Sequence, residues 1–383
     1  MKQIINAHLL TPSGWEKEGT VVIDGGKIIE AGKFRGLTEN AEIIDAKGNY
    51  VVPGGIEIHA HGGGGRDFME GTEDAFRTVM ETHLKHGTTS FFPTLASSTV
   101  EMIEQAAETC TKLMEEEHSP FIGLHLEGPY LNPVMGGGQI PEYIKGANPE
   151  EYIPLVEKWT CIKRWDAAPE LPGALEFASY LRDKGIVAGI AHTNAAYDEI
   201  RKGYEAGFTH ATHFYNGMTG IHKRNEYRHE GTVESIYLID GITVEIIADG
   251  KHLPPSILAL VHKFKGVERT CLVTDALACT GVADAKAFDP RVIIEDGVCK
   301  LSDTKALAGS VATMDRLIRT VVNEAGIPLA DAVRMASETP AKVMGVYDRK
   351  GSLEKGKDAD LLFLDKNFDL TKVFSYGREI KLD

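Results

Sequence analysis

The sequence predicts an α/β protein, a (β/α)8 TIM barrel with a small β-sandwich domain built from both termini. Two patterns predict this fold. Strand-like runs alternate with longer helical patterns through the middle of the chain, about eight times. Both ends consist instead of short strand-like runs joined by tight turns. The composition of the 383 residues, 43% hydrophobic and 25% charged, is that of a folded globular protein.

The two ends of the chain each carry too little sequence for a core of their own. Residues 21–30 read as a hairpin around an Asp-Gly-Gly turn, and residues 351–364 run from turn-forming residues into an apolar strand. We therefore expect the two ends to pair with each other. The expected domains are residues 1–53 with 347–383, and a barrel over residues 54–346.

The barrel strands are expected where short apolar, β-branched runs occur, and helical periodicity fills most of the gaps between them. The expected strands are 51–59, 88–94, 121–127, 162–168, 186–192, 209–213, 243–249 and 271–275. The clearest expected helices are 72–86, 99–117, 173–184 and 194–206. A doubly wound open sheet would give the same alternation. However, the first strand is followed by a plain glycine run at 62–65 and not by a dinucleotide-binding Gly-x-Gly-x-x-Gly motif.

Charge and cysteine content narrow the partners and the compartment. The net charge of −15 argues against nucleic acid or an anionic membrane as a partner, although a few local cations could still hold a small anionic substrate. Five cysteines without a Cys-x-x-Cys spacing favour a reducing compartment. The first residues lack an apolar leader, and no apolar run of about 18 residues occurs, so a soluble cytoplasmic protein is expected.

Imidazole and carboxylate side chains fall at the ends of five of the expected strands. They are His59, His61, Glu127, His192, His213 and Asp275. Taken singly, a strand histidine is more often a hydrogen-bonded core residue, and an aspartate at a strand end more often caps a helix. Active sites of such barrels lie at the carboxyl ends of the strands, so the six together predict a site for one or two Zn²⁺- or Fe²⁺-like ions. His125 and His210 lie deeper in their strands, and we expect structural roles for them.

Several segments resemble a known family. Residues 53–61 read Pro-Gly-Gly-Ile-Glu-Ile-His-Ala-His, which resembles the Pro-Gly-x-Ile-Asp-x-His-x-His signature of the metal-dependent amidohydrolase superfamily. The Gly-Lys-Asp-Ala-Asp-Leu run at 356–361 is similar to the end of those enzymes. Residues 123–132, 211–218 and 248–252 resemble one branch, the N-acetylglucosamine-6-phosphate deacetylases. The resemblance extends over essentially the whole chain.

The resemblance implies a metal centre and an acid–base residue. Glu127, His192 and His213 would hold the main metal, and His59 with His61 would complete a second position that Glu127 bridges. Some members replace the histidine pair and use a single ion, so one or two divalent ions are expected, with Zn, Fe, Mn and Co all compatible. Asp275 would take a proton from the attacking water and then deliver it to the leaving amine.

The resemblance also implies a set of substrate contacts. They are Gly138, Gln139, Asn216, Gly217, Arg228, His252, Leu307, Ala308 and Gly309. Asn216 and Gly217 would lie on the phosphate side, His252 at the sugar or acetyl carbonyl, and Arg228 at the phosphate, within one chain or across a homodimer interface. Without the resemblance, His252 reads equally well as a solvated loop residue.

Two segments depart from the family pattern. Residues 219–230 are longer and differently charged than usual, so Lys223 and Arg224 compete with Arg228 for the phosphate. Residues 134–139 end in Gln139, where a histidine often stands. We expect both departures on the substrate side and not on the metal side, which leaves the reaction class intact and the sugar open.

The resemblance therefore implies hydrolysis of the acetamide of N-acetylglucosamine 6-phosphate to glucosamine 6-phosphate and acetate. A deacetylase of another N-acetyl amino sugar, or of an N-acyl amino acid, is the alternative within the superfamily. A non-catalytic scaffold is the alternative from another class. It is disfavoured because Glu127, His192, His213 and Asp275 are all retained.

Overall fold

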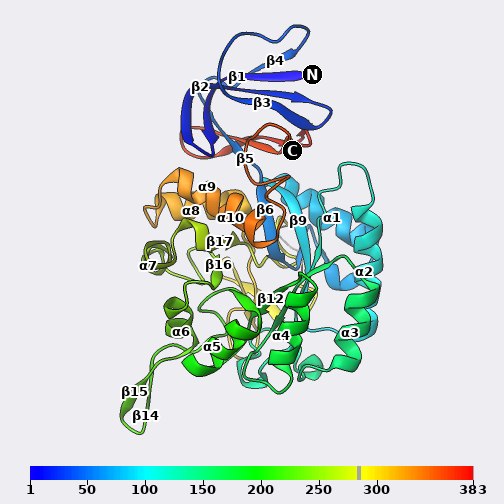
Figure 1. Cartoon of the computed structure of the whole chain (residues 1–383), viewed down its shortest axis with the longest axis vertical. Helices are drawn as coiled ribbons and strands as arrows, with labels where there is room; N and C mark the ends of the chain where they lie inside the picture. The colour runs from blue at the N-terminus through cyan, green and yellow to red at the C-terminus, as the bar shows by residue number, and fades with distance from the viewer. Residues whose placement is uncertain (283–285, 383) are drawn as a thin grey trace.

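The computed structural model describes residues 1–282 and 286–382, which form a barrel with a β-sheet region at one end (Figure 1). Eight parallel strands make the barrel sheet, in the order β17-β16-β13-β12-β11-β10-β9-β6. They are β6 (Gly55–Ala60), β9 (Thr88–Leu95), β10 (Leu124–Tyr130), β11 (Ile162–Ala167), β12 (Val187–Ile190), β13 (Phe208–Ala211), β16 (Thr243–Ile247) and β17 (Thr270–Val273). The Asp275 amide donates to the His59 carbonyl at 2.9 Å, which joins the last strand to the first. The predicted TIM barrel is confirmed.

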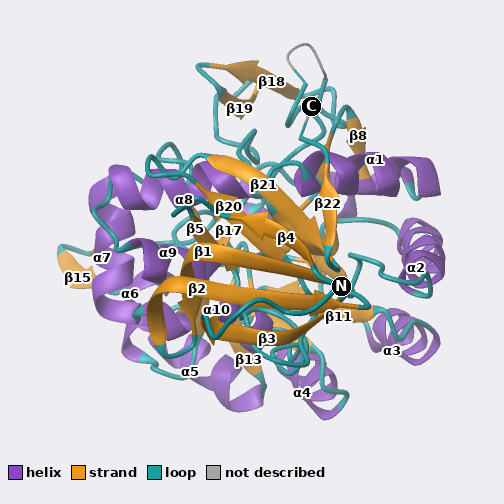
Figure 2. Ribbon diagram, turned by 90° about the horizontal axis from the view of Figure 1, so that it is seen from above, coloured by secondary structure: helices purple, strands orange, loops and turns teal. Residues whose placement is uncertain are grey.

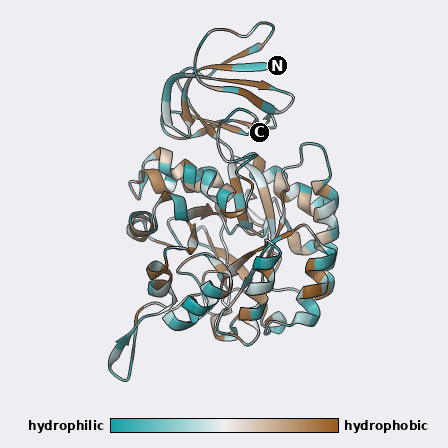
Figure 3. Ribbon diagram, in the orientation of Figure 1, coloured by the Kyte–Doolittle hydropathy of each residue, from teal (hydrophilic) through white to brown (hydrophobic). Residues whose placement is uncertain are grey.

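Helices surround this sheet, and in the view from above most of them form a ring, with α10 inside it (Figure 2). They are α1 (Glu73–Leu84), α2 (Val100–Met114), α3 (Pro149–Lys158), α4 (Ala174–Asp183), α5 (Tyr197–Ala206), α6 (Thr232–Leu238), α7 (Pro255–Lys265), α8 (Met314–Asn323), α9 (Leu329–Ala336) and α10 (Glu338–Val343). The side-chain oxygens of Thr72 and Thr99 accept from backbone amides three residues on, which starts α1 and α2 where the sequence predicts helices. Each helix carries hydrophobic and hydrophilic residues, as Figure 3 shows, because one face packs on the barrel.

The strands of both termini form a second sheet, in the order β22-β21-β20-β5-β1-β2-β3, with β4 paired to β1. They are β1 (Lys2–Thr11), β2 (Gly14–Asp24), β3 (Lys27–Lys33), β4 (Glu42–Asp45), β5 (Tyr50–Pro53), β20 (Leu361–Leu364), β21 (Leu370–Ser375) and β22 (Arg378–Ile380). Antiparallel pairing of β20 with β5 joins the two ends of the chain, with Leu361 opposite Pro53. The small β domain predicted from both termini is therefore confirmed as a mixed sheet.

The expected first barrel strand, 51–59, is two strands that belong to different sheets, β5 and β6. The change falls at Gly54, where a Cβ atom would lie 2.1 Å from Thr89 Oγ1. The backbone therefore packs against β9 more closely than any side chain allows. The division of the chain into domains at 53/54 and 346/347 stays a prediction.

Short elements complete the loops at the carboxyl end of the barrel and elsewhere. They are β7 (Gly62–Gly63), β8 (Arg66–Asp67), β14 (His222–Arg224), β15 (Tyr227–His229), β18 (Val292–Glu295), β19 (Val298–Leu301), and the 3-10 turns Phe68–Glu70, Pro133–Met135, Pro141–Tyr143 and Val267–Arg269. The β14–β15 hairpin projects away from the barrel (Figure 1). No helix among the described residues has both the length and the apolar character needed to cross a membrane.

Candidate metal centre

Six imidazole and carboxylate side chains meet at the carboxyl end of the barrel, and they are the six that the strand ends predict. His59 and Glu127 lie within β6 and β10, whereas the other four follow the ends of their strands by one or two residues. All six are buried, between 0 and 7% exposed. His192, His213 and Asp275 have positive φ angles of 43°, 30° and 49°, a region that non-glycine residues avoid. This conformation turns each of the three out of its strand and is typical of functional sites.

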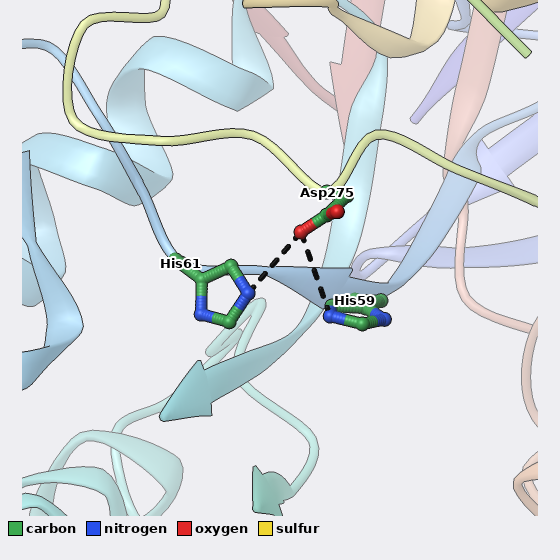
Figure 4. Close-up of side chains that lie close together, drawn as sticks. All are labelled: His59, His61 and Asp275. Atoms are coloured by element: carbon green, nitrogen blue, oxygen red, sulfur yellow. Dashed lines mark ion pairs between the residues drawn. The ribbon is translucent and has the colours of Figure 1, made fainter. Parts of the chain in front are cut away.

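The six side chains form two adjacent triads. In the first triad, Glu127 Oε1 lies 3.0 Å from His192 Nε2 and 2.9 Å from His213 Nε2. In the second triad, Asp275 Oδ1 points toward both histidines (Figure 4), 3.2 Å from His61 Nε2 and 3.6 Å from His59 Nε2. Within each triad one ligand atom from every residue falls within 4.8 Å of the others.

Glu127 connects the two triads through its two oxygens. Oε1 faces the first triad, while Oε2 lies 3.3 Å from His61 Nε2 and 3.6 Å from His59 Nε2. One carboxylate therefore faces both candidate metal positions, which is the arrangement expected of a bridging ligand.

The donor set fits divalent transition metals. His59 Nε2 is buried without a hydrogen-bond partner and faces Glu127 and Asp275. The Nε2 atoms of His192 and His213 lie only 3.1 Å apart, and two lone pairs at this distance repel each other unless a cation or a proton lies between them. Imidazole nitrogens with carboxylate oxygens suit Zn²⁺, Fe²⁺, Mn²⁺ or Co²⁺. The two triads are consistent with a binuclear metal site.

Electrostatics keep the carboxylates of this centre ionised. Burial alone would raise the pKa of Glu127, but the neighbouring His59, His192 and His213 hold it well below its usual range. Burial likewise opposes ionisation of Asp275, and His59 and His61 lower its pKa nonetheless. The pKa of His61 is raised to about 9, against the effect of burial, by Asp275 and Glu127. Protons and metal ions therefore compete for the same imidazole.

A cavity of about 400 Å³ opens directly onto the two triads. Eight of the nine predicted substrate residues line it: Gly138, Gln139, Asn216, Gly217, His252, Leu307, Ala308 and Gly309. Apolar side chains such as Leu277, Phe288 and Val292 make another part of its wall. The cavity is thus a mostly apolar space with its reactive groups at one end.

The ninth predicted residue, Arg228, is not among the residues that line this cavity. It is exposed on the β14–β15 hairpin, as are Lys223 and Arg224. Among the described lining residues there is no lysine or arginine, whereas Asp67 and Asp289 are both present. The described part of this chain therefore supplies no lysine or arginine side chain to bind a phosphate at the cavity wall.

The position of Gln139 differs from what we expected for the segments that depart from the family pattern. Its Nε2 donates to Glu127 Oε2 at 2.8 Å, and its Oε1 accepts from the Ser97 amide at 2.7 Å. The side chain therefore lies on the metal side as well as on the cavity wall. The expectation that this departure stays on the substrate side alone is wrong.

His252 is held in place by Asp249, a residue that the strand-end pattern did not single out. Asp249 Oδ2 lies 2.9 Å from His252 Nδ1, and Oδ1 accepts from the backbone amides of Lys251 and His252. This carboxylate fixes the imidazole on the loop where it lines the cavity. The solvated-loop reading of His252 is wrong.

Beneath the centre lies a buried polar layer that the sequence reasoning missed. It consists of Glu57, Arg164, Asp166 and Glu245, each 0% exposed. His125 and His210 belong to it: His125 Nε2 lies 2.8 Å from Asp166 Oδ2, and His210 Nε2 lies 3.2 Å from Glu245 Oε2, so their predicted structural roles are confirmed. The sequence did contain a sign of this layer, because all four charged residues lie within strands that were expected to be buried in the barrel.

Comparison with known proteins agrees with this geometry. The model of the amidohydrolase family matches residues 50–380, and the chain belongs to that family. Among its relatives, an N-acetylglucosamine-6-phosphate deacetylase of Haemophilus influenzae is 32% identical over 382 residues, covering 98% of each chain. An N-acetylgalactosamine-6-phosphate deacetylase of Escherichia coli O157:H7 is 29% identical over 386 residues, covering 99% of each chain.

Comparison with solved structures finds relatives of the same kind. An N-acetylglucosamine-6-phosphate deacetylase of Pasteurella multocida superposes with a TM-score of 0.93 at 32% identity, covering 99% of each chain. A variant from Mycobacterium smegmatis, solved in complex with N-acetyl-D-glucosamine-6-phosphate, superposes with a TM-score of 0.91 at 29% identity, again over 99% of each chain. The chain is thus an amidohydrolase of the N-acetylhexosamine-6-phosphate deacetylase family.

Proposed function

We propose that the protein hydrolyses the acetamide of N-acetylglucosamine 6-phosphate and releases glucosamine 6-phosphate and acetate. The observation that carries this proposal is the pair of triads joined by Glu127 at the end of a cavity large enough for a sugar phosphate. Relatives named for this activity match over almost the whole chain. N-acetylgalactosamine 6-phosphate is the second candidate, because a relative of nearly equal similarity is named for it.

Five of the six side chains would hold metal in this proposal. Glu127, His192 and His213 would bind one ion, and His59 with His61 would bind a second ion that Glu127 also contacts. A divalent ion in such a site lowers the pKa of water towards about 7 and polarises a carbonyl oxygen.

Asp275 is the proposed acid–base residue. Its Oδ1 faces His61 and His59, and Asp275 also lines the cavity, so we expect it to reach both the attacking water and the substrate. As the water oxygen bonds to the carbonyl carbon, Asp275 takes the proton. As the C–N bond breaks, it returns that proton to the amine nitrogen, so acetate and a free amino sugar leave and the carboxylate is regenerated.

The proposed phosphate end of the site calls for a cationic side chain, and the described residues of the cavity wall include no lysine or arginine. Asn216 and Gly217 offer amide groups, and the hairpin carries the candidate cations Lys223, Arg224 and Arg228. We propose that the protein is a homodimer and that Arg228 of one copy reaches the phosphate in the cavity of the other. A planar guanidinium gives two parallel hydrogen bonds to a phosphate, which favours an arginine over Lys223.

The test is acetate release by the purified, metal-loaded protein. The substrates are N-acetylglucosamine 6-phosphate, N-acetylgalactosamine 6-phosphate, both unphosphorylated sugars and an N-acetyl amino acid. We expect the highest kcat/KM with N-acetylglucosamine 6-phosphate. Equal rates with the unphosphorylated sugars would contradict the phosphate assignment. No acetate from any of the five compounds, with Zn²⁺, Fe²⁺, Mn²⁺ or Co²⁺, would contradict the proposed activity.

A further inference from the structure

Glu245 contacts both triads from the buried layer beneath them. It lies in β16, is 0% exposed, and is not among the residues that line the cavity. Its Oε1 lies 2.5 Å from His59 Nδ1, and the same oxygen accepts from the backbone amide of His213 at 2.9 Å. A single carboxylate oxygen therefore contacts one residue of the second triad and one of the first.

The other oxygen of Glu245 is fixed by an equally buried cation. Oε2 accepts from Arg164 Nη1 at 2.5 Å and lies 3.2 Å from His210 Nε2. Arg164 in turn donates to both oxygens of Asp166, at 3.0 and 3.1 Å, and to Thr212 Oγ1 at 2.8 Å. Because every one of these partners is buried, Glu245 cannot turn away from His59 without breaking its buried ion pair with Arg164.

The four imidazoles of the centre differ in what supports their Nδ1 atoms. Nδ1 of His61 and of His213 is buried without a partner. Nδ1 of His192 lies 2.8 Å from the carbonyl oxygen of Met135, a neutral acceptor. His59 alone of the four has an anionic partner, Glu245. A carboxylate that accepts from Nδ1 keeps the proton there, leaves the lone pair on Nε2 and makes the imidazole a stronger ligand.

We propose that Glu245 is a positioning residue for the second metal position, the one that His59 and His61 would hold. It fixes His59 in the tautomer whose Nε2 faces Glu127 and Asp275, each 3.6 Å away, and it holds the His213 backbone through the same oxygen. The inference rests on the proposed metal centre. It goes beyond that centre because it makes occupancy of the second position depend on a residue that touches neither metal nor substrate.

The experiment measures metal binding and does not depend on activity. Metal-free wild-type and Glu245→Gln proteins are titrated with Zn²⁺ against a chromophoric chelator, and bound metal is counted by mass spectrometry after desalting. We expect two equivalents in the wild type. In Glu245→Gln we expect the second equivalent to bind about 10- to 100-fold more weakly. The first equivalent should change by less than about threefold, because His192, His213 and Glu127 keep their side-chain contacts.

A matched variant separates positioning from general damage to the buried layer. His210→Gln removes the other histidine contact to the same carboxylate but leaves the Glu245–His59 pair in place. It should keep both equivalents within about threefold of wild type even where its melting temperature falls. If Glu245→Gln does not fold, Glu245→Asp replaces it. The aspartate side chain is one methylene shorter but keeps its negative charge beside Arg164. It should still lower the affinity for the second Zn²⁺ ion.

Three results would overturn the inference. The first is two equivalents in the glutamine or aspartate variant with wild-type affinities. The second is equal weakening of the second equivalent in His210→Gln, which would indicate a merely structural role. The third is a wild-type protein that never binds more than one equivalent. Deacetylation of the phosphorylated sugar is measured separately, so each of these results can be distinguished from a failure of the proposed activity.

Discussion

The two sides of the barrel mouth are built in different ways. On the metal side, six side chains of one chain converge, are 7% exposed at most, and are backed by a buried charged layer. On the sugar side, loops and glycines line the cavity, and the described residues there include no lysine or arginine. The proposed reaction chemistry thus resides within one chain, whereas the groups proposed to select the substrate lie on loops and on a projecting hairpin.

This difference has a physical origin. Strand ends in a closed parallel barrel are held by their ladders on both sides, so side chains placed there keep a defined geometry. Loops are free to change in length and charge without disturbing the core. Residues 219–230 show this, because the hairpin they contain is exposed and projects from the barrel. Single substitutions on each side can test how far the two sides act independently.

Asp275→Asn should have the largest effect. The amide cannot take a proton from water, so kcat should fall by about 10²- to 10⁴-fold while the substrate affinity changes little. Steady-state kinetics with N-acetylglucosamine 6-phosphate measure both quantities. Asp67→Asn is the control, because Asp67 is also a buried carboxylate on the cavity wall and asparagine can still cap the following turn. A comparable loss in Asp67→Asn would contradict the assignment of the proton to Asp275.

The hairpin should give the next largest effect. Arg228→Ala should raise KM for the phosphorylated sugar by about 10- to 100-fold, because a charge-assisted hydrogen bond contributes about 1.5–3 kcal/mol. The unphosphorylated sugar should be unaffected. Lys223→Ala and Arg224→Ala are the matched comparisons, and a larger effect of either would move the phosphate contact to that residue. Mixing Arg228→Ala with Asp275→Asn should restore partial activity if the arginine acts across a dimer, and no recovery would place it within one chain.

The sequence predicted the metal side well because strand geometry is regular. Once His59, Glu127 and Asp275 are placed at the carboxyl ends of parallel strands of one barrel, the fold brings them together without further information. The confirmed pairing of the two termini followed from local turn and strand patterns. Both successes depend on regular elements whose side-chain directions follow from sequence spacing.

Regular spacing does not reveal contacts between side chains that lie far apart in the sequence or on loops. Glu245 lies inside an apolar strand, and only the three-dimensional structure brings it to His59, 186 residues away in sequence. Gln139 lies on a loop whose path no periodicity predicts, so its contact with Glu127 on the metal side was not expected. The break between β5 and β6 depends on a close approach of Gly54 to Thr89, a packing contact that the apolar run does not show.

Gln139 connects the two sides and should give an intermediate effect. Gln139→Met keeps the length of the side chain but removes the donor to Glu127 Oε2, so metal affinity should fall by about tenfold. Titration of the metal-free protein measures this. The exposed Gln105→Met serves as the control and should bind metal as the wild type does. Wild-type metal affinity in Gln139→Met would restrict this residue to the substrate side.

Substitution of His83 should give the smallest effect. It tests whether the closely packed structure on the metal side includes His83, which is buried and contacts the His61–Gly62 turn. Its Nε2 donates to the Gly62 carbonyl at 3.0 Å, and burial lowers its pKa to about 4 from the ordinary 6.5. Between these two pH values the unfolded chain binds a proton that the folded protein does not. The free energy of unfolding should therefore fall as the pH drops, by up to about 1.4 kcal/mol per pH unit from this residue.

His83→Phe removes this titration and keeps a ring against Phe91, whose centroid lies 5.1 Å from that of His83. Urea unfolding of the metal-free protein at several pH values from 7.5 to 4.5 gives the slope. The variant should be less stable at pH 7.5, because the Gly62 carbonyl loses its donor, yet its stability should decline less steeply below pH 6.5. The variant should keep part of the pH dependence of its free energy of unfolding because of His125. The pKa of His125 is lowered to about 4, chiefly by burial and by Arg164. If the free energy of unfolding depends equally on pH in the wild type and in His83→Phe, then His83 titrates alike in the folded and unfolded states. The closely packed structure on the metal side would then not include His83.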